Sequence, residues 1–326
     1  MPRDELAWLQ LRQSPMNTPL VLVSHTLTLS ALLLPHSPSA STARGGRPAL
    51  AQPAVQELCE WLGAHGGSAS VVAGTGPYGL GLLATRPLQA GDVAVSVPAS
   101  CLLPARPPED APALARLQQK VPDEFWAAKL ALALIAERSK GERSAFHAYL
   151  ATLPSAFTVP LFWSPEAVQM LAGYPTAQRR LVKAAKFVDS FAREELAGSD
   201  VAAEAFGGVA VGADALGWAV AACTSRAYAV KGGARVLCPV IDVGNHAAKG
   251  QASCEVRGTL GGGLELVAVR DLEAGEEVTY CYGAKLSNDD FLLDYGAPIP
   301  CARSVSLRAP AGLLTHYLLP SAPPLP

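Results

Sequence analysis

The chain has 326 residues, of which 50% are hydrophobic and 17% are charged. This composition supports a substantial buried core in one or two globular domains and excludes an intrinsically disordered protein. The 26 basic and 28 acidic residues leave a net charge of −2. The chain therefore has no broad positive field, and nucleic acid is not an expected partner.

The first 50 residues differ in composition from the rest of the chain. No acidic residue occurs between Glu5 and Glu57, while Ser, Thr, Ala and Pro accumulate beside Arg12, Arg44 and Arg47. This pattern is typical of an organelle transit peptide. We predict that residues 1–50 are a transit peptide or a disordered leader and that the protein acts in the chloroplast, with cytoplasm or nucleus as alternatives. The short apolar run also fits a secretory signal, although unpaired cysteines disfavour secretion.

The folded part is expected to begin with a short helix over residues 53–63. Proline stands near its start, Val55, Leu58 and Leu62 share one stripe, and Gly63 ends it. Short strands separated by Gly and Pro follow, and we expect them at residues 70–73, 81–85 and 93–97. Residues 51–104 are thus predicted to be a β block.

A helical region is expected next. Pro122, Asp123 and Glu124 begin it, and apolar side chains follow at helical spacing. Further helices are expected over residues 165–172 and 176–196. Strands return at 236–240, 252–257, 264–269 and 278–282. The sequence therefore predicts an α+β fold in which a helical insertion (105–222) separates two β blocks (51–104 and 223–300), followed by a short tail (301–326).

Two nine-residue segments, 84–92 and 268–276, are alike in sequence. Both carry Ala, Arg, Leu, Ala, Gly and a final acidic residue at matching positions. Each is predicted to be a strand, a Gly-containing turn and another strand. The similarity is informative only together with other motifs, because unrelated hairpins converge on such turns.

The cysteines and the apolar stretches exclude several kinds of site. The seven cysteines are scattered and never form a Cys-x-x-Cys pair. We expect neither a disulfide framework nor a bound metal. His25 and Pro35 interrupt the first long apolar stretch, so we expect no membrane-spanning helix and no membrane partner, and we predict a monomer.

Four short motifs carry candidate chemistry. They are Gly79-Leu80-Gly81, Ser225-Arg226-Ala227-Tyr228, Pro239 to His246, and Tyr280-Cys281-Tyr282-Gly283 with Asp294-Tyr295-Gly296 after it. Each alone is weak, because Gly-x-Gly usually marks a turn and Tyr-x-Tyr in a strand usually marks packing. The absence of a third glycine and of a following helix argues against a dinucleotide-binding turn.

In this order the motifs resemble the SET domain, and in particular the subfamily of the Rubisco large-subunit methyltransferase, in which a helical insertion splits the catalytic fold. The resemblance covers about residues 70–297. It implies an enzyme that transfers a methyl group from S-adenosylmethionine to a lysine side chain of a partner protein. Histidine methylation and a non-catalytic cofactor-binding module are the alternatives.

The resemblance also implies roles for individual residues. Tyr282 would orient the acceptor nitrogen as the catalytic residue, and Tyr295 would close the wall of the same channel. The cofactor would contact Tyr78, Gly79, Leu80, Gly81, Arg226, Asn245, His246 and Tyr295. The substrate would contact Arg226, Asp242, Cys254, Tyr282 and Tyr295.

The sequence departs from the subfamily at three places. Tyr78 replaces the usual Glu before the glycine motif, Cys254 replaces an aromatic residue expected in the lysine channel, and Val230 stands where a basic substrate contact can occur. The short tail further suggests that the helical substrate-binding domain of the relatives is truncated or absent. These departures concern the substrate more than the cofactor.

Overall fold

The computed structural model describes residues 53–76 and 79–296, which form two units. The larger unit contains residues 53–76, 79–162 and 179–296, and the smaller contains residues 163–178. The predicted leader, the tail and Tyr78 lie outside the described residues. In the smaller unit, Ser164 caps helix α6 (Pro165–Gln169) by accepting from the backbone N–H of Ala167, and a 3₁₀ turn (Met170–Gly173) follows.

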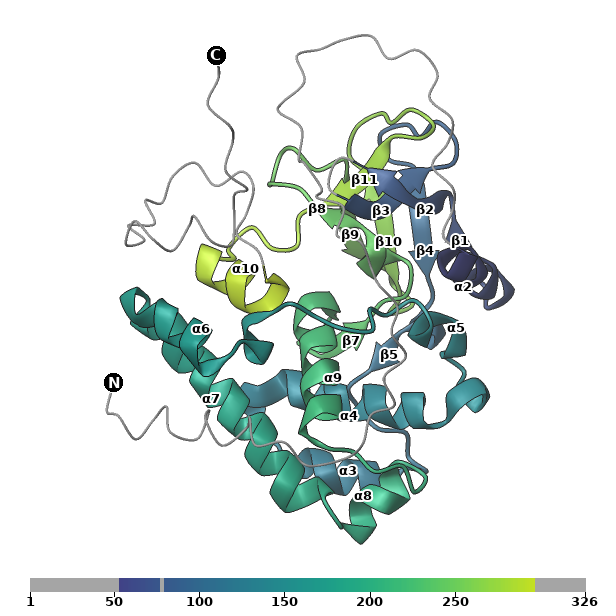
Figure 1. Cartoon of the computed structure of the whole chain (residues 1–326). Coiled ribbons are helices and arrows are strands. Elements are labelled where there is room, and N and C mark those ends of the chain that lie inside the picture. Colours follow the sequence, from purple (N-terminus) through teal and green to yellow (C-terminus); the bar gives the residue numbers. More distant parts are fainter. Residues whose placement is uncertain (1–52, 77–78, 297–326) are drawn as a thin grey trace, which may run out of the picture. The chain divides into compact units, whose positions relative to one another are not determined.

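The helices of the larger unit are mostly in the segment that the sequence predicted to be helical. They are α2 (Pro53–Ala64), α3 (Pro112–Gln119), α4 (Trp126–Ser139), α5 (His147–Leu150), α8 (Asp200–Ala205), α9 (Ala213–Arg226), α10 (Asn288–Tyr295) and the part of α7 (Pro175–Phe191) from residue 179 on. Helices α4 and α9 pack against each other (Figure 1). Both are rich in buried alanine, which lets the two backbones approach closely.

Three small sheets make up the β part of the same unit. Their strand orders are β1-β4-β10-β9, β2-β3-β11-β8 and β5-β7-β6. The strands are β1 (Ser68–Ala69), β2 (Val71–Gly76), β3 (Gly79–Ala84), β4 (Val93–Val97), β5 (Leu103–Pro104), β6 (Ala227–Ala229), β7 (Arg235–Leu237), β8 (Asn245–His246), β9 (Cys254–Gly258), β10 (Leu264–Ala268) and β11 (Glu277–Tyr280). All pairs are antiparallel except β8 with β11. The predicted α+β class is thus confirmed.

The two similar sequence segments pair with each other. Leu88 and Leu272 exchange backbone hydrogen bonds of 2.9 and 2.8 Å. On either side of this pair, the N–H of Gly91 donates to Ala268 and the N–H of Gly275 donates to Ala84. As a result the strands on either side of one turn pair with the strands on either side of the other, β3 with β11 and β4 with β10.

The side chains repeat the same arrangement. Arg86 pairs with Asp92 in the first segment, and Arg270 pairs with Glu276 in the second. Each of these acids also accepts a hydrogen bond from a backbone N–H three residues earlier. The similarity noticed in the sequence is therefore a structural repeat rather than chance convergence of two turns.

Some predicted strand ends were wrong. The strand expected over 236–240 ends at Leu237, because Pro239 has no N–H to donate and Val240 adopts a positive φ of 68°. The strand expected over 278–282 ends at Tyr280, which places Tyr282 in the turn that follows. The helix expected over 176–196 does end at Leu196, although its last turn, Ala192–Leu196, is π-helical.

Candidate functional site

Tyr282 is held at both its hydroxyl and its backbone. Its hydroxyl donates to the carbonyl of Gly244 at 2.9 Å, and its N–H donates to Nδ1 of His246 at 3.2 Å. Because Nδ1 accepts, the neutral imidazole carries its proton on Nε2. Burial lowers the pKa of His246, which favours this neutral form.

Pairing of β8 with β11 brings two distant motifs together. Thr279 lies opposite Asn245 and Tyr280 lies opposite His246 in a parallel register, and the N–H of Ala247 donates to the carbonyl of Tyr280. Gly244 is required at this junction, since a Cβ there would lie 2.9 Å from the ring of Tyr280. The Asn-His motif and the Tyr-x-Tyr motif thus form one site.

The glycine motif lies against Asn245. Nδ2 of Asn245 donates to the carbonyl of Leu80 at 3.0 Å and to Oε1 of Glu277 at 2.8 Å. A Cβ on Gly81 would lie 2.6 Å from Nδ2, so glycine leaves the space that the amide occupies. Gly79 has a φ of 94°, which favours glycine there as well.

Arg226 and Asp242 form a buried pair beneath this site. Nη1 of Arg226 donates to the backbone carbonyl of Asp242 at 2.8 Å and lies 3.6 Å from its carboxylate Oδ2. The same Oδ2 accepts from the hydroxyl of Tyr149 at 2.7 Å. Burial raises the pKa of Asp242, opposed by the charge of Arg226 and the bond from Tyr149.

This pair leaves two polar atoms without partners. Nε of Arg226 and Oδ1 of Asp242 are buried and have no hydrogen-bond partner among the described residues. The side chain of Asp242 is only 1% exposed. The predicted contacts of Arg226 with the cofactor, and of both residues with the substrate, stay predictions.

An aromatic cluster surrounds Tyr282. Its ring lies 4.9 Å from that of Tyr295 and 5.2 Å from that of His246, and Phe291 lies 4.8 Å from His246. The i, i+4 spacing puts Phe291 and Tyr295 on one face of α10, whose N-terminus has a capping box of Ser287 and Asp290. Burial raises the pKa of Tyr282 to about 12, so its hydroxyl stays protonated at neutral pH.

Cys254 lies on β9 and is 1% exposed. Burial raises the pKa of its thiol to about 11, so it is a small apolar side chain rather than a thiolate. Whether it lines a lysine channel stays a prediction. The predicted cofactor contact of Tyr78 lies outside the described residues.

Four residues of the site had no role in the sequence interpretation. Tyr149, Tyr280 and Glu277 are buried. The hydroxyl of Tyr228 is hydrogen-bonded to the hydroxyl of Tyr280. Their partners are 32 to 93 residues away in the chain. Tyr228 and Tyr280 lie within two of the four motifs and Glu277 lies three residues before one, whereas Tyr149 lies outside all of them.

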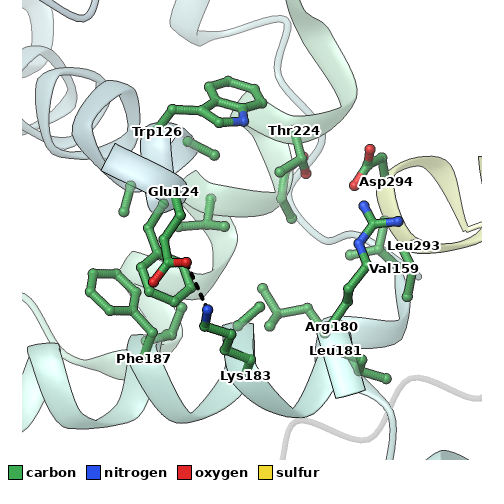
Figure 2. A pocket seen from close by; sticks show the side chains of 18 residues that line it. Glu124, Trp126, Val159, Arg180, Leu181, Lys183, Phe187, Thr224, Leu293 and Asp294 are labelled. Carbon is green, nitrogen blue, oxygen red and sulfur yellow. Dashed lines mark hydrogen bonds and ion pairs between the residues drawn. The ribbon is translucent and has the colours of Figure 1, made fainter. Parts of the chain in front are cut away.

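A cavity of about 270 Å³ lies against another face of α10 (Figure 2). Leu293 and Asp294 of α10 face it, together with Arg180 and Lys183 of α7 and Thr224 of α9. Most of the other lining side chains are apolar. Figure 2 shows Asp294 and Arg180 close together at one end and the Glu124–Lys183 ion pair at the other.

The described residues contain no group of three or more His, Cys, Asp or Glu that could hold a metal ion. None of the helices in the described ranges is long and apolar enough to span a membrane. The residues that would hold S-adenosylmethionine fit its chemistry, because a glycine-edged backbone, the carbonyl of Asn245 and the Nε2–H of His246 offer both acceptors and donors. Gly81 contributes indirectly, because it leaves the space in which the Asn245 amide lies.

Comparisons with known proteins agree with this geometry. The family model of the SET domain matches residues 79–283. The chain is 28% identical over 268 residues to the chloroplastic Rubisco large-subunit N-methyltransferase of Pisum sativum, covering 77% of this chain and 53% of that protein. It is 33% identical over 120 residues to SET domain-containing protein 4 of Homo sapiens, covering 35% of this chain and 27% of that protein.

Solved structures are also similar. A structure of Rubisco LSMT bound to AdoMet has a TM-score of 0.62 and 27% identity, covering 77% of this chain and 57% of that one. A structure of the SET domain of LSMT bound to lysine and AdoHcy has a TM-score of 0.62 and 26% identity, covering 77% and 58%. The chain thus spans little more than half the length of the pea relative and of these structures.

Proposed function

This chain belongs to the SET domain family, and from that premise we propose that it transfers the methyl group of S-adenosylmethionine to a lysine side chain of a protein. The observation that carries the proposal is the double anchoring of Tyr282. Its hydroxyl is bound to Gly244 and its N–H to His246, directly beside Asn245. The solved relatives bound to AdoMet, AdoHcy and lysine support the choice of cofactor and acceptor.

When bound, S-adenosylmethionine supplies an electrophilic methyl group on a sulfonium. Gly79, Leu80, Gly81, Asn245 and His246 would hold it, with Arg226 and Tyr295 as further contacts and Tyr78 as a contact outside the described residues. Asn245 and His246 lie within two residues of Gly244, which binds the Tyr282 hydroxyl. The reacting methyl and the acceptor would therefore meet close to that hydroxyl.

Tyr282 orients the acceptor rather than removing its proton. Its only hydroxyl proton is already donated to Gly244, so the oxygen presents lone pairs that accept an N–H of the incoming amine. The nitrogen lone pair is then directed away from Tyr282, toward the methyl group, as an in-line displacement requires. The phenolic dipole also stabilises the positive charge that develops on the nitrogen.

The aromatic cluster favours the neutral form of the acceptor. A free lysine has a pKa of about 10.4 and is almost entirely charged at neutral pH. The rings of Tyr282, Phe291 and Tyr295 pack beside the hydroxyl, so an amine that reached it would lose part of its hydration, which disfavours the ammonium form. The proton is lost to solvent as the side chain enters, so no dedicated base is needed.

We further propose that the protein acts in the chloroplast. The pea relative is described as chloroplastic, and the composition of residues 1–50 supports a transit peptide. The partner is a protein that carries the acceptor lysine, and the chain acts as a monomer. The identity of that partner follows from the experiment below.

The test uses the full chain, radiolabelled S-adenosylmethionine and a chloroplast extract, followed by mass spectrometry of the labelled peptides. Label on lysine in the wild-type reaction, with none for Tyr282→Phe, is the expected result. Label on histidine would show that the acceptor is histidine and not lysine. Cofactor binding without any transfer to extract proteins would indicate that the chain is a non-catalytic cofactor-binding module.

A further inference from the structure

We propose that Glu277 is a positioning residue that fixes the amide of Asn245 with its carbonyl oxygen facing the ligand, so that the site selects a ligand with an N–H donor at that point. The inference rests on the proposed function, because the ligand is taken to be the methyl-donor cofactor. It concerns a residue that the sequence interpretation gave no role.

Both partners of the Asn245 amide are acceptors. The carbonyl of Leu80 and the carboxylate Oε1 of Glu277 lie 3.0 and 2.8 Å from Nδ2. A flipped amide would place its oxygen against these two oxygens and lose both bonds. The orientation of Asn245 is therefore determined by its surroundings.

The other end of the amide remains available. Oδ1 of Asn245 receives no hydrogen bond from the described residues. It is also not one of the buried atoms that lack a partner, so solvent or a ligand can reach it. An oxygen in this position can only accept. A ligand at this site must therefore bring an N–H or O–H donor or leave the oxygen to water.

The fold makes room for Glu277 at this place. Glu277 lies on β11 opposite Leu83 of β3 and is 9% exposed. A Cβ on Gly76 would lie 2.3 Å from Oε2, and a Cβ on Gly81 would lie 2.8 Å from Oε1. The carboxylate thus occupies space that Gly76 and Gly81 of the β2–β3 hairpin leave free.

This arrangement is unfavourable for stability alone. Oε2 of Glu277 is sealed from solvent and has no partner among the described residues. A buried carboxylate oxygen without a hydrogen bond costs free energy, and a shape-matched apolar side chain would avoid that cost. Such a feature beside a ligand-binding amide is typical of a functional constraint.

S-adenosylmethionine has two kinds of N–H donor that fit. One is the α-amino group of its amino-acid portion, and the other is the 6-amino group of adenine. The shared chemistry is an N–H group directed at Oδ1. The experiment distinguishes the two sources.

The test measures dissociation constants by calorimetry for three ligands. They are S-adenosylhomocysteine, its analogue without the α-amino group, and its analogue with a 6-oxo group in place of the 6-amino group. For the wild type we expect one analogue to bind roughly tenfold or more weakly than the parent, the equivalent of about 1.4 kcal/mol. That analogue identifies the donor that Oδ1 accepts.

Glu277→Gln keeps the shape but allows either end of its amide to face Asn245, so the orientation is no longer fixed. We expect this variant to bind the parent compound about tenfold more weakly and the sensitive analogue almost unchanged. Discrimination between the two is therefore lost. The matched control is Glu276→Gln, which changes the preceding carboxylate on the repeat turn, and its three dissociation constants should equal those of the wild type.

An equal weakening of all three ligands, or no change, in folded Glu277→Gln would overturn the proposal while leaving the proposed function intact. Failure of the wild type to bind S-adenosylhomocysteine would overturn both. Should Glu277→Gln not fold, Glu277→Asp keeps the acceptor but retracts it by one methylene. The same loss of discrimination is expected for it, and retained discrimination would count against the proposal.

Discussion

The hydroxyl of Tyr282 donates a hydrogen bond to the backbone carbonyl of Gly244 at 2.9 Å. This bond connects the turn after β11 to the turn that leads into β8. Together with the parallel pairing of these two strands, it fixes the phenolic oxygen relative to Asn245 and His246. Removal of the hydroxyl should therefore affect chemistry much more than folding.

We predict that Tyr282→Phe lowers kcat by about 10²–10³-fold or more, because the amine loses the oxygen that orients it. Stability should fall by about 1 kcal/mol, the usual contribution of one hydrogen bond. Steady-state kinetics and urea unfolding measure the two effects. Tyr174→Phe in the smaller unit is the matched control, and its kcat should stay at the wild-type value. A full kcat for Tyr282→Phe would exclude an orienting role.

The pH dependence of turnover should reflect the ionisation of the acceptor lysine and not that of Tyr282. Burial raises the pKa of Tyr282 to about 12, so the phenol remains protonated through pH 10. The neutral fraction of the acceptor lysine rises with pH over the same range. We expect kcat/KM to rise from pH 7 toward pH 10 without a descending limb. A descending limb between pH 8 and 10 that depended on Tyr282 would show that the phenol ionises there.

Tyr149 should stabilise the buried pair beneath the site. Its hydroxyl is the hydrogen-bond donor to Oδ2 of Asp242, whose Oδ1 already lacks a partner among the described residues. Tyr149→Phe leaves the buried carboxylate with one bond fewer, so we expect a loss of about 1–3 kcal/mol in the free energy of unfolding. In Asp242→Asn the same Tyr149→Phe change should cost less. Equal costs in both backgrounds would show that the two side chains are not coupled.

The repeated turns allow a test of backbone strain. Gly91 and Gly275 have φ values of 99° and 84°, and a Cβ on either would meet no atom within 4 Å. Gly91→Ala and Gly275→Ala should each destabilise the protein by about 1 kcal/mol through backbone strain alone. Gly63→Ala in helix α2 is the control with open space and no positive φ, and it should stabilise by up to about 1 kcal/mol. A change in stability of the same sign for all three variants would contradict this explanation.

Much of the fold could be predicted because the signals are local. Helix α2 was recognisable from its apolar stripe and from the glycine near its end, and the strands were recognisable from Gly and Pro punctuation. The repeat was visible because each turn needs a glycine with positive φ and an acid that accepts from the backbone. These constraints act within a few residues of the chain.

The polar partners within the site could not be predicted in the same way. The bond of Tyr149 to Asp242 joins residues 93 positions apart, and that of Asn245 to Glu277 joins residues 32 apart. No local pattern distinguishes Glu277 from Glu276, although one is buried and the other forms a surface ion pair. The positive φ of Val240 was equally hidden, because a β-branched residue predicts extended backbone.

The last prediction concerns Asp294, which lines the cavity beside α10 (Figure 2). Burial raises its pKa to about 6, Arg180 opposes the shift, and Asp290 adds to it. The folded-state pKa lies above the unfolded value, so ionisation of Asp294 opposes folding as the pH rises from about 4 through 6. Asp294→Asn should therefore be more stable than the wild type at pH 8, by about 1–3 kcal/mol, and equally stable near pH 4.

Asp290 on the same helix provides the control. Bonds from Ser287 and Arg180 outweigh its burial and lower its pKa, so its ionised form stabilises the folded state. Asp290→Asn should lose stability at pH 8 and approach the wild type as the pH falls below about 4. Urea unfolding at several pH values from 4 to 8 measures both variants. Because the two substitutions remove the same charge one helical turn apart, opposite signs at pH 8 can only come from their different surroundings. If both variants instead followed the wild-type pH profile in parallel, neither carboxylate would be coupled to folding.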